Sequence, residues 1–312
     1  MRQEPVSRTV DLDGPVHHVD HGGPAWSTSP DQPAVVCVHG LGGSHANWHD
    51  LAPLLAQTHR VHALDLAGHG RTPRAGRSSS VRANCALLGR FVEEVVGGPV
   101  VLVGNSMGGA ISLLHAAASP ASVAGLVLIG PALPRMRAEV PDRALARHVA
   151  RYAVPGLAQR ALVKRRARLG AEGMIRETLE LTTADATRVS PGLRRLAVEL
   201  LETRASGPDS EAAFLEAARS LAVLVTRAGA YREAIASVRA PALVLQGTMD
   251  RLVPPGGVAQ LAALQPGWQV ELLEGVGHVP QIEVPERTAA LVLPFLESLP
   301  AATPDQRLAG AS

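Results

Sequence analysis

The sequence contains the segment Gly104-Asn105-Ser106-Met107-Gly108-Gly109 (GNSMGG). An apolar run, residues 99–104 (PVVLVG), precedes it, and small helix-forming residues follow from 107 to 118. A G-x-S-x-G pattern between a strand and a helix puts the serine on a sharp, strained turn, so that its hydroxyl projects above the edge of a sheet. Glycines two positions before and after the serine let the strand and the helix approach without a clash between Cβ atoms. The helix N-terminus also presents free N–H groups where an oxyanion would form. The segment therefore predicts that Ser106 is a nucleophile.

Short apolar runs alternate with longer helix-like segments on both sides of this segment, which is typical of a parallel α/β sheet. Further strands are predicted at residues 34–39, 61–66, 123–129, 241–246 and 269–273, with a hairpin at residues 6–12 and 16–20. Between two of these strands, the chain is rich in Ala, Leu, Arg and Glu and reads as several helices in a row. We therefore predict an α/β fold with a mostly parallel central sheet flanked by helices. Its parts are a core of residues 1–133 and 239–300, an inserted helical cap of residues 134–238 and a flexible tail of residues 301–312.

A second glycine-rich segment, HGLGGS at residues 39–44, directly follows the first buried strand. Its backbone N–H groups are free to point at a substrate oxygen, and the loop lies beside the serine turn if the two strands are neighbours. The segment is not a dinucleotide-binding fingerprint, because position 45 is His where G-x-G-x-x-G requires Gly.

Two later segments supply an acid and a base. A serine hydroxyl is a poor nucleophile and needs a base, which in turn needs an orienting acid. Asp250 comes shortly after the strand at 241–246, and His278 lies in the loop after the last strand. Both positions are at the carboxyl ends of strands, where open α/β sheets place groups that bind ligands. The strand at 123–129 is followed by Gly-Pro-Ala, which offers no rival carboxylate.

These segments together resemble α/β-hydrolase-fold serine hydrolases with a helical cap, which are esterase- or lipase-like and distantly similar to carbon–carbon bond hydrolases. The resemblance covers about residues 16 to 299 and rests on HGLGGS, DLAGHGRT, GNSMGG, GTMDRLVP and GVGHVPQIEVP. It implies that Ser106 is the nucleophile, His278 the general base and then acid, and Asp250 the orienting acid. It also implies an oxyanion hole made by the backbone N–H groups of Leu41 and Met107, and a reaction that needs no cofactor or metal.

The expected reaction is hydrolysis of a carboxylic ester, thioester or lactone with an apolar acyl part, through an acyl-enzyme on the serine. Trp48 and Val279, with the two oxyanion-hole residues, are candidates for the acyl pocket because each lies in or beside a motif. One alternative is a carbon–carbon bond hydrolase of vinylogous diketones. The segment GNSMGG, including Asn105, resembles those enzymes, but they carry an aromatic residue after the catalytic His, where this chain has Val279. The other alternative is a non-catalytic ligand-binding member of the fold.

Several other polar residues have structural and functional interpretations. We expect Asp65 and His69 to shape the loop after their strand, with a direct catalytic role as the alternative, and Glu283 to order the loop of the base. Two groups of histidines, at 17, 18 and 21 and at 45 and 49, lack a recognisable pattern of metal ligands, so no metal is predicted. A basic run from Arg160 to Arg168 is expected to be a solvated helix face, with attraction of anionic or lipid-like substrates as the alternative.

Composition excludes several classes of protein. Thirty basic and 28 acidic residues nearly balance, which argues against a nucleic-acid partner. Lys164 is the only lysine and follows Val163, which excludes a P-loop. Two cysteines cannot build a disulfide framework, and the N-terminal residues lack the apolar stretch of a secretory signal. We expect a cytoplasmic protein without an integral membrane segment that acts on a small molecule. The natural substrate and the oligomeric state do not follow from the sequence.

Overall fold

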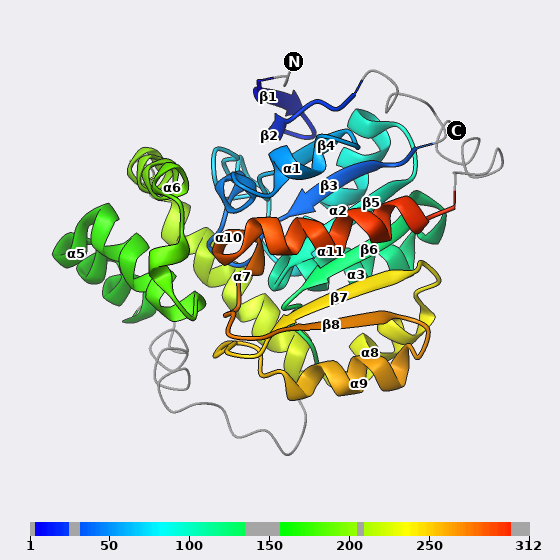
Figure 1. Ribbon diagram of the computed structural model, residues 1–312. Coiled ribbons are helices and arrows are strands. Elements are labelled where there is room, and N and C mark those ends of the chain that lie inside the picture. Colours follow the sequence, from blue (N-terminus) through cyan, green and yellow to red (C-terminus); the bar gives the residue numbers. More distant parts are fainter. Residues whose placement is uncertain (1–3, 25–31, 135–156, 205–208, 301–312) are drawn as a thin grey trace.

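An eight-stranded sheet forms the centre of the molecule, with the strand order β1-β2-β4-β3-β5-β6-β7-β8 (Figure 1). The structure, a computed structural model, describes residues 4–24, 32–134, 157–204 and 209–300. The strands are β1 (Val6–Asp11), β2 (Pro15–Asp20), β3 (Ala34–Val38), β4 (Val61–Leu64), β5 (Val100–Asn105), β6 (Val123–Ile129), β7 (Ala242–Gly247) and β8 (Gln269–Leu273). β2 is antiparallel to both of its neighbours, and the other neighbouring strands are parallel. The predicted mostly parallel sheet and the predicted N-terminal hairpin are therefore confirmed.

The central strands are apolar on both faces because a separate core covers each face. In β3, Val35 and Cys37 belong to one core, called the first core below, and Val36 and Val38 belong to the other, called the second core. This is the alternation of side chains that a strand requires. Burial raises the pKa of the Cys37 thiol well above its ordinary value.

Helices cover both faces of the sheet. Residues of α1 (Ala52–Leu55) and α11 (Pro285–Ser298) fill the first core, and α11 runs across the front of the sheet in Figure 1. The second core is filled by residues of α2 (Val81–Phe91), α3 (Met107–Ala118), α7 (Asp209–Thr226), α8 (Ala228–Ser237) and α9 (Gly256–Leu264). This three-layer arrangement leaves the loops at the carboxyl ends of the strands to carry polar side chains.

The insertion between β6 and β7 is helical. It contains α5 (Leu157–Thr182), η5 (Ala186–Arg188), α6 (Pro191–Arg204), α7 (Asp209–Thr226) and α8. Gly170 interrupts α5 with φ of 64°, and α6 begins at Pro191. α5 and α6 lie beyond one end of the sheet, whereas α8 packs against α3 in the second core (Figure 1). Neither α5 nor any other helix in the described ranges is apolar over a length that would span a bilayer.

The division into core, cap and tail stays a prediction. Residues 135–156, at the start of the predicted cap, and residues 301–312, the predicted tail, lie outside the described ranges. The described part shows that the last predicted cap helix, α8, belongs with the layer of helices on the sheet. Its composition resembles that of its neighbours in the insertion, and only the packing separates it from them.

Two buried histidines face each other in the second core. His18 on β2 lies with its ring centroid 5.3 Å from that of His62 on β4 and 5.0 Å from that of Phe91. Among the described residues, neither ring nitrogen of His18 has a hydrogen-bond partner. Burial, reinforced for His18 by repulsion from His62, lowers the pKa of each of these two histidines to about 4. Both are therefore neutral in the folded protein near neutral pH.

This pair makes the fold sensitive to acid. Between pH 6.5 and about 4 the unfolded chain binds protons at these histidines that the folded chain does not bind, so the free energy of unfolding falls as the pH is lowered. We expect His18→Phe to remove a contribution on the order of 1 kcal/mol to the loss between pH 7 and pH 4.5. Urea denaturation at both pH values measures this difference.

The control for this comparison is His49→Gln, because the side chain of His49 is 41% exposed. This variant should keep the acid response of the wild type. If His18→Phe lost as much stability between the two pH values as the wild type does, the pair would not be a source of acid sensitivity.

Candidate active site

Ser106 occupies the turn between β5 and α3 in a strained backbone conformation, with φ of 55° and ψ of −116°. Positive φ is uncommon for a residue other than glycine and is held here by surrounding contacts. The Ser106 N–H donates to the carbonyl of Ile129 at 3.0 Å, and the Ser106 carbonyl accepts from Ala132 at 3.0 Å. From residue 100 to residue 113, Ser106 alone is not fully buried. Ser106 is therefore the partly exposed residue between a buried strand and a buried helical segment.

Two glycines allow the close approach that this turn requires. A Cβ atom on Gly108 would lie 2.0 Å from the Val38 carbonyl oxygen, and one on Gly104 would lie 2.7 Å from the Gly108 carbonyl oxygen. These distances are far inside van der Waals contact, so the first turn of α3 rests directly on the end of β3. The sequence-based explanation for both glycines is confirmed.

The HGLGGS loop lies next to this turn because β3 and β5 are neighbours in the sheet. The Leu41 N–H has no acceptor among the residues that the structure describes. Met107 is the first residue of α3, and its N–H is one of the four that a helix leaves without an intrahelical acceptor. His39 holds the base of the loop, since its Nδ1–H donates to the Gly40 carbonyl and its Nε2 accepts from the Leu66 N–H. The N–H groups of Leu41 and Met107 are thus both near Ser106 and available to donate to a bound oxygen atom.

Asp250 and His278 form a hydrogen-bonded pair, with Asp250 Oδ2 2.7 Å from His278 Nδ1. Gln246 Nε2 donates to the same carboxylate oxygen at 2.9 Å, and the N–H groups of Leu252 and Val253 donate to the other at 2.8 and 2.9 Å. Because a carboxylate only accepts, the proton of a neutral His278 is on Nδ1, and its Nε2 is left with a lone pair. The pair has the polarity that a general base requires.

Asn105 links this pair to the serine turn. Its Nδ2 donates to the carbonyl of Ile129, which also accepts from Ser106, and to the carbonyl of His278 at 3.2 Å. A Cβ atom on Gly130 would lie 3.1 Å from His278 Nδ1. The predicted nucleophile, acid and base therefore follow the carboxyl ends of β5, β7 and β8, at the same edge of the sheet.

The loop of His278 is tied to the inserted helices. The His278 N–H donates to the Thr182 carbonyl at 2.7 Å, at the end of α5. The buried carboxylate of Glu283 accepts from the N–H groups of Gly277, Ala184 and Asp185 and from the guanidinium of Arg188. Glu283 thus orders this loop, as expected, and joins it to the insertion.

Other residues of the insertion contact the remaining loops of this edge. A Cβ atom on Gly42 would lie 3.1 Å from the Phe214 ring on α7, and one on Gly68 would lie 2.4 Å from the Ala213 Cβ atom. With the contact at His278, the insertion therefore rests on three loops at this edge of the sheet, those of Gly42, Gly68 and Gly277.

Two residues of the basic run are paired within the insertion, Arg165 with Glu177 and Arg166 with Glu211.

The two candidate pocket residues are both buried. Trp48 is fully enclosed in the first core with β3 and α1, which does not favour a role in substrate contact. Val279 packs with Leu179 and Leu193 of the insertion. Their assignment to an acyl pocket stays a prediction.

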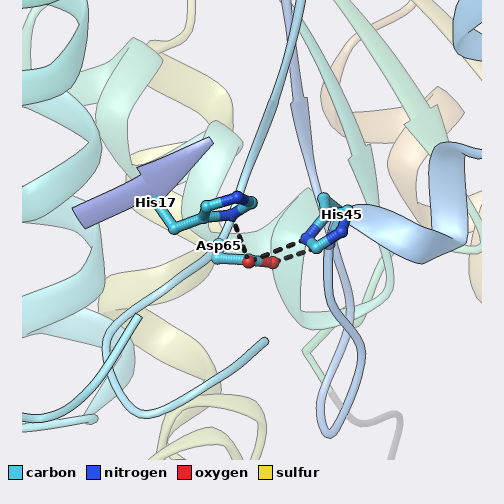
Figure 2. A group of neighbouring side chains, drawn as sticks. All are labelled: His17, His45 and Asp65. Carbon is cyan, nitrogen blue, oxygen red and sulfur yellow. Dashed lines mark hydrogen bonds and ion pairs between the residues drawn. The ribbon is translucent and has the colours of Figure 1, made fainter. Parts of the chain in front are cut away.

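Asp65, next to the site, is the centre of a separate hydrogen-bond network. Figure 2 shows the rings of His17 and His45 on either side of its carboxylate. Both Nδ1 atoms lie 2.8 Å from Asp65 Oδ2, and the backbone N–H groups of His45 and Arg71 donate to the same carboxylate. A Cβ atom on Gly70 would lie 2.2 Å from the Asp65 carboxylate, which explains the glycine at that place. Asp65 joins β2, the segment after the HGLGGS loop and its own loop, as the structural interpretation predicts.

The same three side chains are the group in the described residues that could hold a metal ion, since their ligand atoms lie within 4.8 Å of one another. In the present geometry, however, N–H donors occupy both oxygens of Asp65. His69 is also structural, because its Nδ1–H donates to the Ala67 carbonyl. The cluster is built as a hydrogen-bond network around one carboxylate.

Two contributors to the site were missed in the sequence. Gln246 ends an apolar strand, and a polar residue in that place was a usable signal. The Thr182 carbonyl, by contrast, comes from a helix that no motif connects with His278, so nothing in the sequence indicates the contact.

Comparison with known proteins places these motifs in context. A family model described as the alpha/beta hydrolase fold matches residues 33–285. The chain is 27% identical over 264 residues to a pimeloyl-(acyl-carrier protein) methyl ester esterase from Aeromonas hydrophila, covering 85% of this chain and 95% of that protein. It is 25% identical over 269 residues to a 2-hydroxy-6-oxononadienedioate/2-hydroxy-6-oxononatrienedioate hydrolase from Cupriavidus pinatubonensis, covering 84% of this chain and 86% of that protein.

Solved structures agree on the fold. The crystal structure of a haloalkane dehalogenase from Bradyrhizobium elkani superposes with a TM-score of 0.77 at 22% identity, covering 94% of this chain and 97% of that one. At this identity the similarity concerns the fold alone.

The contact of α3 with β3 generates a prediction about stability. Gly108→Ala should lower the free energy of unfolding by about 2 kcal/mol or more, because the new methyl group overlaps the Val38 carbonyl oxygen. Chemical denaturation measures the change.

Gly229→Ala, in α8, is the matched control, since nothing lies within 4 Å of the added methyl group. Alanine in an open helical position should stabilise the protein by up to about 1 kcal/mol. Equal stability changes in the two variants would contradict the proposed close contact.

Proposed function

The chain belongs to the α/β-hydrolase family, and on that premise we propose that it is a serine hydrolase that cleaves a carboxylic ester, thioester or lactone. The observation that carries the proposal is the strained, accessible Ser106 at the same sheet edge as a histidine whose Nδ1 is held by Asp250. The relative from Aeromonas hydrophila, an ester esterase by name, supports an ester as the substrate class.

The proposed reaction begins with attack of Ser106 Oγ on the carbonyl carbon, while His278 Nε2 takes the hydroxyl proton. Asp250 keeps the imidazole in the required tautomer and stabilises the imidazolium that forms. The N–H groups of Leu41 and Met107 donate to the developing oxyanion. The imidazolium then protonates the leaving alcohol or thiol, and an acyl-enzyme remains. Water, activated by the same imidazole, releases the acid and restores the serine.

We further propose that α5, α6 and the first half of α7 are a cap over the substrate site. This narrows the predicted cap, since α8 packs in the second core, as does the second half of α7 from Ala217 onward. The proposal is supported by the contacts of the insertion with the loops of Gly42, Gly68 and Gly277. Such a cap excludes water and shapes the acyl pocket, so it governs KM and chain-length preference more than the chemical step. The substrate is then a small molecule with an apolar acyl part.

The second candidate is a carbon–carbon bond hydrolase, which the relative from Cupriavidus pinatubonensis supports. The sequence mark for it, Asn105, has a structural task here because it binds the carbonyls of Ile129 and His278. A panel of p-nitrophenyl esters of increasing chain length, run beside a dienoate diketone, distinguishes the two. Preferred turnover of an ester supports the first proposal, and preferred turnover of the diketone overturns it in favour of the second.

Removing the nucleophile tests the proposal most directly. Ser106→Ala should reduce kcat for the best ester by about 10⁶-fold, because the acyl-enzyme cannot form. The thermal unfolding midpoint should stay close to that of the wild type. A fluorophosphonate that labels Ser106 in the wild type, with the site determined by peptide mass spectrometry, would separate an enzyme from a binding protein. Substantial turnover by a folded Ser106→Ala protein would rule out this nucleophile.

The two buried aspartates should respond differently to the same change. Asp250→Asn should keep the fold but reduce kcat by about 10⁴-fold, because the amide favours the wrong tautomer of His278. Asp65→Asn should mainly reduce stability, by about 3 kcal/mol, since the amide has a single accepting oxygen and its NH2 group would face an N–H donor that now binds a carboxylate oxygen.

Thermal unfolding and kcat, measured on both variants at a temperature where each is folded, make the comparison. The assignment of the acid would be wrong if folded Asp65→Asn lost orders of magnitude in kcat while Asp250→Asn stayed near the wild type.

A further inference from the structure

A second chain of serine, histidine and aspartate lies outside the proposed site. Ser7 Oγ on the edge strand β1 is 2.6 Å from His17 Nε2 on β2. His17 Nδ1 is in turn 2.8 Å from Asp65 Oδ2, the contact drawn in Figure 2. Ser7 is exposed, whereas His17 and Asp65 are buried. The hydroxyl at the open end of this chain can therefore meet a molecule from solution.

The register of the hairpin creates the first contact. Ser7 pairs with Val19 and Thr9 pairs with His17, so Ser7 and His17 are diagonal neighbours on one face of the antiparallel pair. Diagonal neighbours lie within reach of long side chains, and the imidazole covers the remaining distance. Both partners are held by strands, which makes the arrangement rigid.

The direction of the hydrogen bonds follows from the state of Asp65. Burial alone would raise the pKa of this carboxyl, but hydrogen bonds from His17 and His45 hold it well below its ordinary value. A carboxylate accepts only, so neutral His17 carries its proton on Nδ1 and offers a lone pair at Nε2. Ser7 must then donate its hydroxyl proton to His17. This is the polarity in which an imidazole acts as a general base towards a serine.

A positive charge lies beside the same hydroxyl. Arg71 Nη1 donates to Ser7 Oγ at 3.3 Å, and Arg71 Nη2 is also 3.3 Å from Glu199 of α6. A guanidinium in this place favours negative charge on Oγ and on an oxyanion formed next to it. Ser7 thus has a base on one side and an electrostatic stabiliser on the other.

We infer that Ser7 is a second activated serine, which accepts an acyl or phosphonyl group from small activated electrophiles such as aryl esters and fluorophosphonates. With an aryl ester, Oγ attacks the carbonyl carbon while His17 Nε2 takes the proton. The ester C–O bond then breaks, and the phenolate leaves with that proton as the phenol. The product is an acylated Ser7. With a fluorophosphonate, Oγ attacks phosphorus, the P–F bond breaks and fluoride leaves, while the proton stays on His17 until solvent takes it. Ser7 lies within a strand and not at a helix N-terminus, so the acyl group is released slowly and the reaction is a single-turnover modification.

The test uses the full chain carrying Ser106→Ala, so that label on Ser106 does not interfere. A fluorophosphonate and, separately, p-nitrophenyl acetate are added, and adducts are located by peptide mass spectrometry over time. We expect one adduct, on Ser7, that forms at least about 100-fold faster than any adduct on the exposed Ser298. Ser298 is a matched control because its hydroxyl donates to the Phe295 carbonyl and has no base beside it within residues 4–24, 32–134, 157–204 and 209–300.

Two further variants in the Ser106→Ala background connect the rate with the chain. His17→Asn places an amide N–H where Nδ1 lies and so keeps a donor for Asp65, but removes the base. Arg71→Gln removes the cation and leaves the backbone N–H that binds Asp65. The rate at Ser7 should fall about 100-fold in the first and by a smaller factor in the second. Ser7→Ala alone should leave ester turnover by Ser106 unchanged.

The inference is overturned if Ser7 in the Ser106→Ala protein reacts no faster than Ser298. It is also overturned if a folded His17→Asn variant, checked by its thermal unfolding, is labelled at the unreduced rate. Arg71→Gln tests the mechanism without depending on the fold of the histidine variant, because its side chain is 38% exposed. If the rate of labelling at Ser7 is unchanged in the Arg71→Gln variant, the guanidinium does not assist the reaction.

Discussion

The contact between the first turn of α3 and the end of β3 is the constraint on which the rest of the site depends. Gly108 lets the helix backbone lie against the Val38 carbonyl, and Ser106, two residues earlier, has the strained φ of 55°. Because β3 is held in this place, the loop that follows it brings Leu41 beside the serine turn. The position of the serine and that of the neighbouring N–H groups therefore both depend on the absence of a Cβ atom at Gly108.

The base, in contrast, takes its position from two separate parts of the chain. Its side chain is held by Asp250, which lies in the loop after β7. Its backbone is held from the side by Thr182, which belongs to the insertion. A change in how the inserted helices rest on the sheet would thus act on His278 directly, whereas Ser106 depends on the sheet and α3.

Much of this organisation can be predicted from local patterns. Runs of Val and Leu that are buried on both faces locate the parallel strands. The six-residue segment GNSMGG locates the turn at Ser106, because a strand ends and a helix begins within it. Two contacts between distant segments could not be predicted. The packing of α8 on α3 has no signal because its composition matches that of the other inserted helices. The contact between Ser7 and His17 depends on the register of a hairpin, and an exposed serine in a strand belongs to no motif.

The carboxylate of Glu283 has a consequence for how such a chain can be recombined. Its donors come from Gly277 on one side and from Ala184, Asp185 and Arg188 on the other, so the segment after α5 and the loop of His278 form one indivisible module. A chimaera in which foreign helices replaced this segment as well would leave the buried Glu283 carboxylate without the donors from Ala184, Asp185 and Arg188. Grafting boundaries placed outside residues 182–188, with the acceptor loop retained, preserve the network. Helices outside residues 182–188 can then be exchanged without removing a partner of Glu283.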